Sequence, residues 1–543
     1  MHPAERIKRL MKLRKPDYYA SMCGETENAQ DVRVSFAVED GALKVRLRAE
    51  ETPVRFLRLR WNYTEEERPS GALRVLGDHW ERGYGDMEWR SIRPERMLPW
   101  YFFLTDGSDS VRAQSCRVWA YGVMVQPAAF CSWSCDTQGV TLMLDVRCGG
   151  KGVHLDGREL EVASVLFEEY RSEDFSEAAR GGAGSIFLAC EAFCRRMCPH
   201  PIFPKEPVYG SNNWYYAYGN SSHEEILSDT RIVAELTKGL SNRPFMVIDD
   251  GWQMTNVDGP WHVGNERFPD MKRLAEEISA MDVKPGIWYR PLADIGRRTP
   301  GVTEDMRLSR CGDYLDPSHP AVKELLYRDM KRLTGWGFRL IKHDYSTFDL
   351  FGSWGVDLHG CSITNQDGWN FWDTSKTSAE IVLDFYRLLR EAAGPDVLIL
   401  GCNTVSHLCA GLVELNRTGD DTSGRQWERT RQRGVNTLAF RMMQNRTFYD
   451  ADADCVGITE QVPWELNRQW LHALAVSGSP LFVSCKPGVL NDAQLDELRE
   501  AFAFASVQRD RFVPLNWTET SCPDRWLHNG DEIALRWIPE TGR

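Results

Sequence analysis

The sequence predicts an α/β fold in which a (β/α)8 TIM barrel follows an N-terminal antiparallel β-sandwich and precedes a short β-rich C-terminal region. Apolar and polar residues alternate with a period of two from residue 31 to about residue 170, which is typical of short antiparallel strands. From residue 208 onward, eight short apolar runs alternate with amphipathic segments, which is the pattern of a barrel built from βα units. A chain of 543 residues is also long enough for two or three domains.

The regions on either side of the barrel have patterns of their own. The sandwich is expected over residues 1–172, where residues 32–41 alternate Val or Phe with polar side chains and end in an Asp-Gly turn. A helical linker is expected over 173–207, a segment rich in Ala, Glu and Arg that ends in four closely spaced prolines. Residues 491–543 are expected to form a helix at Asp492–Phe504 and a β-rich region that is short for a domain and could be truncated.

The barrel is expected over residues 208–490. Its predicted strands are Val208–Trp214, Phe245–Trp252, Lys284–Arg290, Arg339–Tyr345, Val397–Asn403, Leu412–Thr418, Thr447–Asp452 and Ser479–Cys485. Helices are predicted between them, at Glu224–Thr237, Met271–Ser279, Ala321–Thr334 and Ser378–Ala393. A doubly wound open sheet is the competing topology, but the sequence has no Gly-x-Gly-x-x-Gly after the first strand and no Walker A loop. Nucleotide binding is therefore not supported, and no cofactor is expected.

The charge balance and the cysteines limit the function classes. Lys and Arg number 65 against 78 Asp and Glu, and the net charge of −13 disfavours nucleic acid or an anionic membrane as the main partner. The first residues contain no apolar signal-peptide core, and no run of about 18 uncharged apolar residues follows. The 15 cysteines lack zinc-site spacing and several lie in apolar runs, so they are interpreted as reduced thiols without a metal. These features predict a cytoplasmic enzyme with a neutral substrate.

Charged residues stand at the ends of the predicted strands, which form the catalytic face of a β/α barrel. The fourth strand ends in Lys342-His343-Asp344, and the nearby lysine favours the charged form of the Asp344 carboxylate, as a nucleophile requires. The sixth strand ends in Arg417, followed by the acids Asp420 and Asp421. Glycoside hydrolysis with retention needs two carboxyl groups, one that attacks and one that protonates the leaving oxygen. The two strand ends therefore predict a glycosidase site.

The other strand ends carry side chains that suit a sugar. Asp249-Asp250 follow the second strand, and adjacent carboxylates are costly there unless a polar ligand such as a pair of hydroxyls engages them. Trp214 at the first strand could stack on a pyranose ring, and Arg290 after Trp288 could reach the pocket. The fifth strand ends in the small polar pair Cys402-Asn403. For each of them, an ordinary structural role as a helix cap or core residue is the alternative.

Together these segments resemble the clan of retaining α-galactosidases that holds glycoside hydrolase families 27 and 36. The resemblance is closer to family 36, which includes bacterial α-galactosidases and plant raffinose-synthase-like proteins, and it extends to the N-terminal sandwich and the β-rich tail. The matching segments, in family order, are Asn213-Trp214, Asp249-Asp250-Gly251-Trp252, Lys342-His343-Asp344, Arg417–Thr422, Asp452-Ala453-Asp454-Cys455 and Ser484–Gly488. Each segment alone is weak, and their combination is specific.

The resemblance implies the catalytic roles. Asp344 would be the nucleophile that forms the glycosyl-enzyme. The acid/base of related enzymes lies four residues after the arginine, which selects Asp421 here. A register one residue earlier selects Asp420 as the second choice.

The resemblance also implies the sugar contacts. Asp249 and Asp250 would hold the 4- and 6-hydroxyls, Lys342 would contact hydroxyls, Trp214 would form an apolar wall and Arg417 would bind near the 2-position. The complete predicted substrate-binding set is Trp214, Asp249, Asp250, Trp252, Trp288, Arg290, Lys342, Cys402, Asn403, Arg417 and Asp420.

The activity implied is that of a retaining exo-acting α-galactosidase, with a carbohydrate as its partner. His343, Cys402-Asn403 and Arg290 depart from the family pattern, and the last stands where bacterial relatives carry glutamate. These departures leave an α-N-acetylgalactosaminidase as an alternative. A raffinose-synthase-like galactosyl transferase is a further alternative, because that choice depends on whether water or an acceptor sugar reaches the intermediate. A catalytically inactive carbohydrate-binding protein is the alternative from another class, although binding alone needs no nucleophile and acid pair. Related enzymes are often dimers or tetramers, so a homo-oligomer is also left open.

Overall fold

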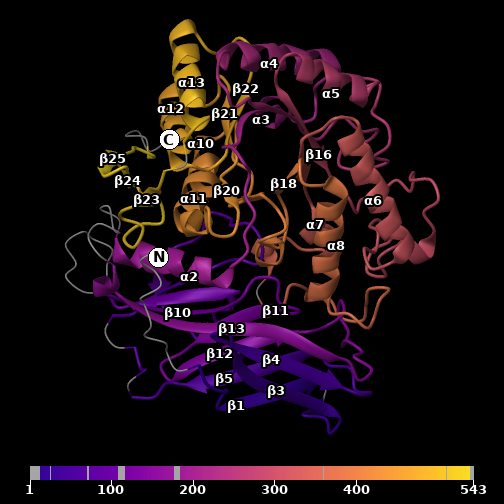
Figure 1. Ribbon diagram of the computed structural model, residues 1–543, viewed down its shortest axis with the longest axis vertical. Coiled ribbons are helices and arrows are strands. Elements are labelled where there is room, and N and C mark those ends of the chain that lie inside the picture. Colours follow the sequence, from indigo (N-terminus) through magenta and orange to yellow (C-terminus); the bar gives the residue numbers. More distant parts are fainter. Residues whose placement is uncertain are drawn as a thin grey trace.

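The computed structural model describes residues 13–538, apart from residues 25, 66, 70–71, 108–115, 176–183, 359 and 509. The described strands form two antiparallel sheets in the N-terminal part, one nine-stranded parallel sheet and one three-stranded antiparallel sheet near the C-terminus. Figure 1 shows the two N-terminal sheets stacked at one end of the molecule and the parallel sheet, with its helices, at the other. The predicted α/β architecture of a sandwich followed by a barrel-like parallel sheet is confirmed.

The N-terminal sandwich pairs a six-stranded sheet with a seven-stranded sheet, and neighbouring strands in both run antiparallel. The first sheet contains, in spatial order, β2 (Thr26–Glu27), β1 (Tyr18–Cys23), β5 (Phe56–Asn62), β12 (Gly139–Asp145), β11 (Phe130–Cys135) and β8 (Leu98–Pro99). The second contains β3 (Val32–Glu39), β4 (Ala42–Ala49), β13 (Glu159–Arg171), β10 (Arg117–Val123), β9 (Tyr101–Thr105), β6 (Arg74–Gly77) and β7 (Arg90–Ser91).

The alternating pattern of the sequence places one face of each strand in the sandwich core. In β4, Val45 and Leu47 are fully buried while their neighbours point outward. The hairpin that joins β3 to β4 turns at Asp40-Gly41, whose φ angles of 51° and 74° match the left-handed pair of a two-residue turn. Trp61 of β5 meets Phe167 of β13 edge-on at a centroid distance of 5.1 Å, so aromatic rings join the two sheets.

The parallel sheet supplies the strand ends on which the predicted site depends. Its strands, in spatial order, are β20 (Asp450–Asp452), β19 (Leu415–Arg417), β18 (Leu398–Gly401), β17 (Leu340–His343), β16 (Lys284–Tyr289), β15 (Phe245–Ile248), β14 (Tyr209–Asn212), β22 (Leu481–Cys485) and β21 (Cys455–Ile458). Each of the eight predicted strands contains one of them, but the observed strands are shorter, because the polar residues at the predicted ends leave the sheet.

The seventh strand position is divided, which the sequence did not predict. β20 pairs with β19, whereas β21 pairs with β22. Between them Asp454 has a left-handed φ of 73°, and its carboxylate accepts hydrogen bonds from the backbone and side chain of Thr422. Consecutive pieces of the chain thus bond to the strands on either side, and the parallel sheet closes into a barrel.

The helices around the barrel begin at side chains that cap them. Ser222, Asp270 and Thr377 each accept the backbone N–H of the third helical residue in α4 (His223–Leu236), α5 (Met271–Ala280) and α8 (Ser378–Ala393). These helices and α6 (Pro320–Gly335) agree with the predicted helices to within one residue. The other α-helices beyond residue 208 are α3 (Trp214–Ala217), α7 (Ser346–Phe351), α9 (Ser406–Cys409), α10 (Trp427–Thr430), α11 (Thr437–Arg441), α12 (Trp464–Ser477) and α13 (Asp492–Ala505).

The helical linker expected over residues 173–207 contains only a short helix in its described part. A 3-10 turn, η2, covers Ser172–Asp174, and α2 covers Ser185–Met197, while residues 176–183 lie outside the described part. Figure 1 shows α2 between the sandwich and the barrel, where it packs against β10 and β13. Near the C-terminus, β23 (Phe512–Pro514), β24 (Arg525–His528) and β25 (Asp531–Ala534) form the small third antiparallel sheet.

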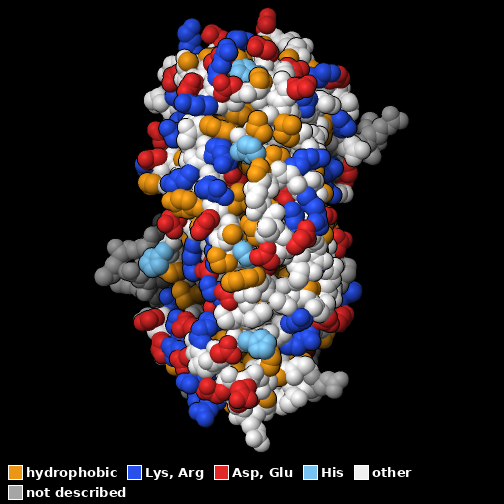
Figure 2. Space-filling view, turned by 90° about the vertical axis from the view of Figure 1, so that its right-hand side faces the viewer, with side chains coloured by type: hydrophobic (Ala, Val, Ile, Leu, Met, Phe, Trp, Pro, Cys, Tyr) orange, Lys and Arg blue, Asp and Glu red, His pale blue; other side chains and the backbone are white. Residues whose placement is uncertain are grey.

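The surface carries charges of both signs. Figure 2 shows acidic and basic side chains interspersed along the visible face, with apolar side chains scattered between them. Within the described part of the chain, none of the helices is both long enough and apolar enough to span a membrane.

Candidate active site

Asp344 directly follows β17, and two hydrogen bonds orient its carboxylate. The indole N–H of Trp288 donates to Oδ2 at 3.0 Å, and the backbone N–H of Tyr345 donates to Oδ1 at 2.7 Å. Tyr345 has a left-handed φ of 64°, which ends the extended chain immediately after Asp344. Asp344 itself is 8% exposed. The carboxylate is therefore held in one orientation, as a positioned nucleophile requires.

Lys342 lies between the carboxylates of the second and fourth strands. Its ammonium donates to Oδ2 of Asp249 at 2.7 Å, and Asn212 Nδ2 donates to the same oxygen at 2.7 Å. Burial alone would lower the pKa of Lys342, but the charges of Asp249 and Asp344 raise it well above its usual value. Lys342 is therefore a fixed cation beside the candidate nucleophile.

Asp250 is buried next to Asp249. Gln253 Nε2 donates to its Oδ1 at 2.5 Å, and the backbone N–H of Val257 donates to the same oxygen at 3.0 Å. Burial raises the pKa of Asp250, and the charge of Asp249 acts in the same direction. The structure thus brings both predicted acids of the second strand together with Lys342.

Arg417, the last residue of β19, connects the sixth strand to the divided seventh strand. Its guanidinium pairs with Asp454 at 2.9 Å and with Asp421 at 3.3 Å, and NH1 lies 3.4 Å from Cys402 Sγ. The side chain is 1% exposed, and its buried Nε has no hydrogen-bond partner. Arg417 and Cys402 therefore lie at the same end of the barrel as Lys342 and Asp344.

The two candidates for the acid have different surroundings. Asp420 pairs with Arg82 at 2.8 Å and with Arg433, and its side chain is 12% exposed. The side chain of Asp421 is 32% exposed. Burial would raise the pKa of Asp421, but Arg417 and Arg82 outweigh burial and hold that pKa below its usual range.

Asp421 lies near the end of the fifth strand, because Arg82 NH1 is 3.8 Å from both Asp421 and Cys402 Sγ. The N–H of Cys402 in turn donates to the carbonyl of His343, the residue before Asp344, at 2.8 Å. Burial raises the pKa of the Tyr345 phenol, and the negative charges of Asp344, Asp421 and Asp250 add to this effect. Lys342 also contributes to lowering the pKa of Asp421. Both acids have arginine partners, but the Asp420 carboxylate is more closely paired, with Arg82 at 2.8 Å and with Arg433, whereas the partner of Asp421 is Arg417 at 3.3 Å.

Sequence reasoning missed Arg82, which comes from the segment between β6 and β7 of the sandwich. Besides its pair with Asp420, its NH1 lies 3.8 Å from Asp421 and 3.8 Å from Cys402 Sγ. Its guanidinium also lies 5.3 Å from the ring centroid of Trp354. A signal existed in the sequence, because residues 78–87 interrupt the alternating pattern with closely spaced charged and aromatic side chains.

Glu81 is the second residue that sequence reasoning missed. It is fully buried, accepts the N–H of Gly355 at 2.7 Å, and also accepts from Asn403 Nδ2 and the hydroxyl of Tyr84. Burial raises its pKa, while Arg82 lowers it. Glu81 thus ties the sandwich to the strand ends of the barrel.

The side chain of Arg290, which was predicted to contact the sugar, bonds to protein groups in the structure. Both NH2 and Nε bond to Asp349, at 2.6 and 3.0 Å, and NH1 donates to the carbonyl of Val257 at 2.8 Å. The guanidinium also stacks over Tyr345 at 4.0 Å from the ring centroid. Each of its three guanidinium nitrogens bonds within the protein, so Arg290 supports the segment around the candidate nucleophile, and its contact with a sugar stays a prediction.

Two further residues predicted to contact the sugar are fully buried and bond to protein groups. Asn403 is fully buried, donates to Glu81 and accepts the N–H of Phe348 at 3.3 Å, so its amide faces the interior. Trp252 is fully buried and donates its indole N–H to the carbonyl of Trp288 at 2.9 Å. Both residues stand near strand ends and their polar atoms bond to protein groups, so their contact with a sugar stays a prediction.

Trp288 and Trp214 differ in burial and in the role that their contacts allow. Trp288 is 1% exposed and contacts Asp344 through its N–H, so it orients the carboxylate rather than offering a stacking face. Trp214, at the start of α3, is only partly buried, and its ring lies 5.6 Å from that of Tyr218. Trp214 therefore remains available as the predicted apolar wall.

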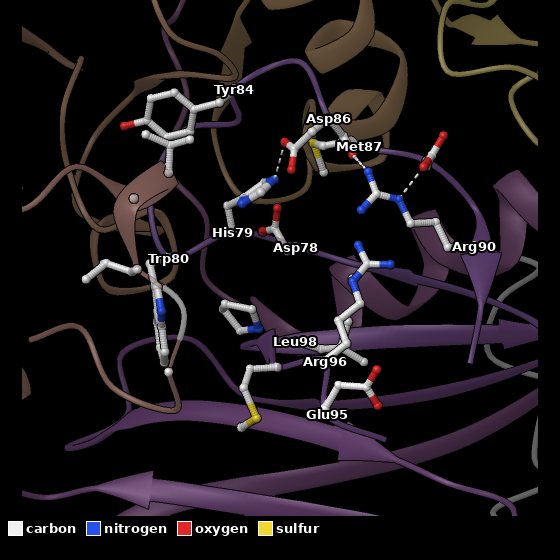
Figure 3. A pocket seen from close by; sticks show the side chains of 18 residues that line it. Asp78, His79, Trp80, Tyr84, Asp86, Met87, Arg90, Glu95, Arg96 and Leu98 are labelled. Atoms are coloured by element: carbon white, nitrogen blue, oxygen red, sulfur yellow. Dashed lines mark hydrogen bonds and ion pairs between the residues drawn. The ribbon is translucent and has the colours of Figure 1, made fainter. Parts of the chain in front are cut away.

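A cavity of about 310 Å³ lies beside this site without containing it. Its lining includes Asp78, His79, Tyr84 and Asp86 from the sandwich and Gly355 from the barrel region. Figure 3 shows His79 paired with Asp86 on one side of this cavity. None of the predicted site residues lines this cavity, so we assign the candidate catalytic site to the strand ends of the barrel. Over the described ranges, no three His, Cys, Asp or Glu side chains are grouped in a way that could hold a metal ion.

Comparison with known structures identifies the fold. No model of a known protein family matches the sequence. An α-galactosidase from Thermus thermophilus in complex with p-nitrophenyl α-D-galactopyranoside aligns over 95% of this chain and 99% of its own, with 18% identity and a TM-score of 0.59. A variant of the GH36 α-galactosidase AgaA from Geobacillus stearothermophilus, in complex with 1-deoxygalactonojirimycin, aligns over 91% of this chain and 70% of its own, with 12% identity and a TM-score of 0.56.

The galactosidase domain of the α-galactosidase-sucrose kinase AgaSK aligns over 92% of this chain and 70% of its own, with 14% identity and a TM-score of 0.57. These alignments include both the sandwich and the barrel. The chain therefore has the fold of the family 36 α-galactosidases.

Proposed function

We propose that this protein is a retaining exo-acting α-galactosidase that hydrolyses terminal α-linked galactose by double displacement. The observation that carries the proposal is the pair of carboxylates Asp344 and Asp421, which follow the fourth and sixth strands and lie near one cation, Lys342. A retaining glycosidase needs two such carboxyl groups about 5–5.5 Å apart. The fold supports the proposal, because the structures compared above are α-galactosidases or a galactosidase domain.

In the first step, an oxygen of Asp344 attacks the anomeric carbon of the galactoside. Asp421 gives its proton to the glycosidic oxygen, the bond from the anomeric carbon to the leaving group breaks, and the sugar remains as an ester of Asp344. The hydrogen bonds from Trp288 and from the Tyr345 backbone keep the attacking carboxylate in place. In the second step, Asp421 takes a proton from water, the water oxygen attacks the anomeric carbon, and galactose leaves with retained configuration.

Sugar binding is assigned to the acceptors and donors around this pair. We propose that Asp249 and Asp250 accept hydrogen bonds from the 4- and 6-hydroxyls, that Lys342 donates to hydroxyls and that Arg417 binds near the 2-position. The partly buried Trp214 supplies the apolar wall. A cytoplasmic location and a homo-oligomer stay predictions, which fractionation and gel filtration would check.

The test is a panel of aryl α-glycosides with wild type and Asp344→Ala. Turnover of the galactoside, in preference to the N-acetylgalactosaminide and the glucoside, is expected for wild type, together with a loss of at least about a thousandfold in Asp344→Ala. NMR of the first product would show α-galactose. Preferential turnover of the N-acetylgalactosaminide would change the substrate, and binding without turnover of any glycoside would contradict the enzyme assignment.

A further inference from the structure

The segment of the sandwich that carries Arg82 is fixed against the loop that carries the candidate acid. The N–H of Gly83 donates to the carbonyl of Thr418 at 2.8 Å, and the N–H of Asp420 donates to the carbonyl of Gly83 at 2.9 Å. Arg441 also donates to the carbonyl of Glu81. The backbone on both sides of Arg82 is therefore held at the end of the sixth strand.

The guanidinium of Arg82 is held less completely than its backbone. Its NH2 pairs with Asp420 at 2.8 Å, but its NH1 makes only long contacts of 3.8 Å to Asp421 and to Cys402. Its Nε is buried and has no hydrogen-bond partner, and the side chain is 8% exposed. The pair with Asp420 thus keeps the positive charge close to Asp421 but outside hydrogen-bonding distance.

Charged and titratable groups from several elements surround Asp421. Arg417 from β19 pairs with it directly, and Lys342 from β17 acts at longer range. The guanidinium of Arg429 in α10 donates to the Asp421 carbonyl at 2.9 Å and lies 4.0 Å from Asp420. The remaining groups are Asp420 on the same loop, Arg82, Tyr215 of α3, Tyr345 at the start of α7, and Asp454, with which Asp421 shares Arg417.

We propose that Arg82 is a positioning residue through which the N-terminal sandwich sets the proton affinity of the acid/base Asp421, and that Asp420 limits this influence by holding the Arg82 guanidinium away. The inference rests on the proposed function and extends it, because it gives Asp420 a role other than that of the acid. Arg82 touches no reacting atom in this proposal.

The physical reason is a competition between two carboxylates for one cation. A positive charge within about 4–6 Å of a carboxyl group favours its charged form and lowers its pKa by about 1–3 units. A general acid must carry its proton at the working pH, and Arg417 and Arg82 already hold the pKa of Asp421 low, so a still closer pairing with Arg82 would oppose the acid step further. Asp420 offers Arg82 a closer partner, which leaves Asp421 the weaker of the two contacts.

The proposal predicts opposite effects for two substitutions. Arg82→Met removes the cation, so the pKa of Asp421 rises and the alkaline limb of kcat/KM moves up by about 1 pH unit. Asp420→Asn removes the competing anion, so Arg82 stabilises the charge of Asp421 more strongly and the limb moves down by about 1 pH unit. Arg82→Lys keeps a cation at this place, and its limb is expected close to that of wild type.

The measurement is the pH dependence of kcat/KM for phenyl and 2,4-dinitrophenyl α-galactoside. Departure of phenol requires the acid, whereas the dinitrophenolate leaves without a proton, so the shifts are expected only with the phenyl substrate. Arg433→Met is the matched control, since Arg433 forms an ion pair with Asp420 and none with Asp421 among the described residues. Its limb should move less than that of Arg82→Met, and thermal unfolding would verify that each variant is folded.

Three results would overturn the proposal. The first is an alkaline limb of Arg82→Met that coincides with wild type, and the second is a shift of Arg82→Met and Asp420→Asn in the same direction. The third is a loss of 2,4-dinitrophenyl galactoside turnover in Asp420→Ala that azide restores by attacking the glycosyl-enzyme, because Asp420 would then be the acid/base itself. If Arg82→Met does not fold, the two other variants test the proposal. It then requires that the alkaline limb of Asp420→Asn moves down and that the limb of Arg82→Lys stays close to that of wild type. A wild-type protein without activity on any glycoside would contradict the proposed function, and this inference would fall with it.

Discussion

Replacing Trp288 by Phe should damage the nucleophile while leaving the barrel folded. The indole N–H of Trp288 donates to Asp344 at 3.0 Å, and phenylalanine keeps an aromatic ring but removes this donor. A hydrogen bond to a charged group is worth about 1.5–3 kcal/mol. Because about 1.4 kcal/mol corresponds to a factor of ten in rate, kcat/KM is expected to fall about 10- to 100-fold.

Trp261→Phe is the matched control for this substitution. Trp261 belongs to the same aromatic cluster, with its ring 5.8 Å from that of Trp288, and its buried Nε1 has no hydrogen-bond partner. Both substitutions remove a similar volume from the core and should lower the free energy of unfolding by about 1–2 kcal/mol. The control therefore separates lost packing from the lost hydrogen bond.

The assay compares kcat/KM for p-nitrophenyl α-galactoside with the free energy of unfolding from urea titrations. We expect Trp288→Phe to lose more stability than Trp261→Phe, by up to the free energy of the lost hydrogen bond, and Trp288→Phe alone to lose most of its activity. Two outcomes would refute the reasoning: Trp288→Phe with kcat/KM within about twofold of wild type, or Trp261→Phe as inactive as Trp288→Phe.

The remaining predictions concern the acid, a buried carboxyl group and a close backbone contact. Azide should restore turnover of an activated galactoside in Asp421→Ala and not in Asp420→Ala, and the reverse result would exchange their roles. Burial raises the pKa of Asp229 from 3.8 to about 6, so ionisation of its carboxyl group opposes folding at neutral pH. Asp229→Asn should therefore stabilise the protein near pH 7 by at most about 3 kcal/mol. Because the pKa of Asp229 is higher in the folded state, this gain in the free energy of unfolding should shrink as the pH falls through about 6 and vanish below 3.8. Urea titrations that show an equal gain near pH 4 would contradict the raised pKa. A Cβ at Gly419 would overlap the carbonyl oxygen of Arg433, so Gly419→Ala should displace the loop that carries Asp420 and Asp421 and lower kcat/KM more than about tenfold. An unchanged rate would show that this loop can adjust.

The sequence was informative about the barrel because its signals are local. Each predicted strand contains an observed one, since a short apolar run followed by polar residues marks both the strand and the point where it ends. The helices agreed to within one residue because their caps, such as Thr377 at α8, stand in the sequence itself. The division of the seventh strand was missed, because nothing local in Ala453-Asp454 indicates that flanking residues pair with different neighbours.

The contents of the site were less predictable, since they depend on partners distant in the chain. Arg290 stands at a strand end as expected, yet Asp349, 59 positions later, takes its guanidinium. The amide of Asn403 is engaged by Glu81, 322 positions earlier. Position along a strand therefore predicts which residues reach the catalytic end, but not which of them still face a ligand once the core has packed.

The bond network that connects Arg82 to the barrel has a consequence for how the protein matures. Arg82 and Cys402 stand 320 positions apart, and the ribosome delivers the sandwich long before it delivers the sixth strand. Throughout this interval the arginine has neither of its acidic partners. Activity should therefore appear only after translation has passed the loop between β19 and α10, which carries Asp420 and Asp421. A sandwich transplanted from another protein would need to contact this loop in the same way.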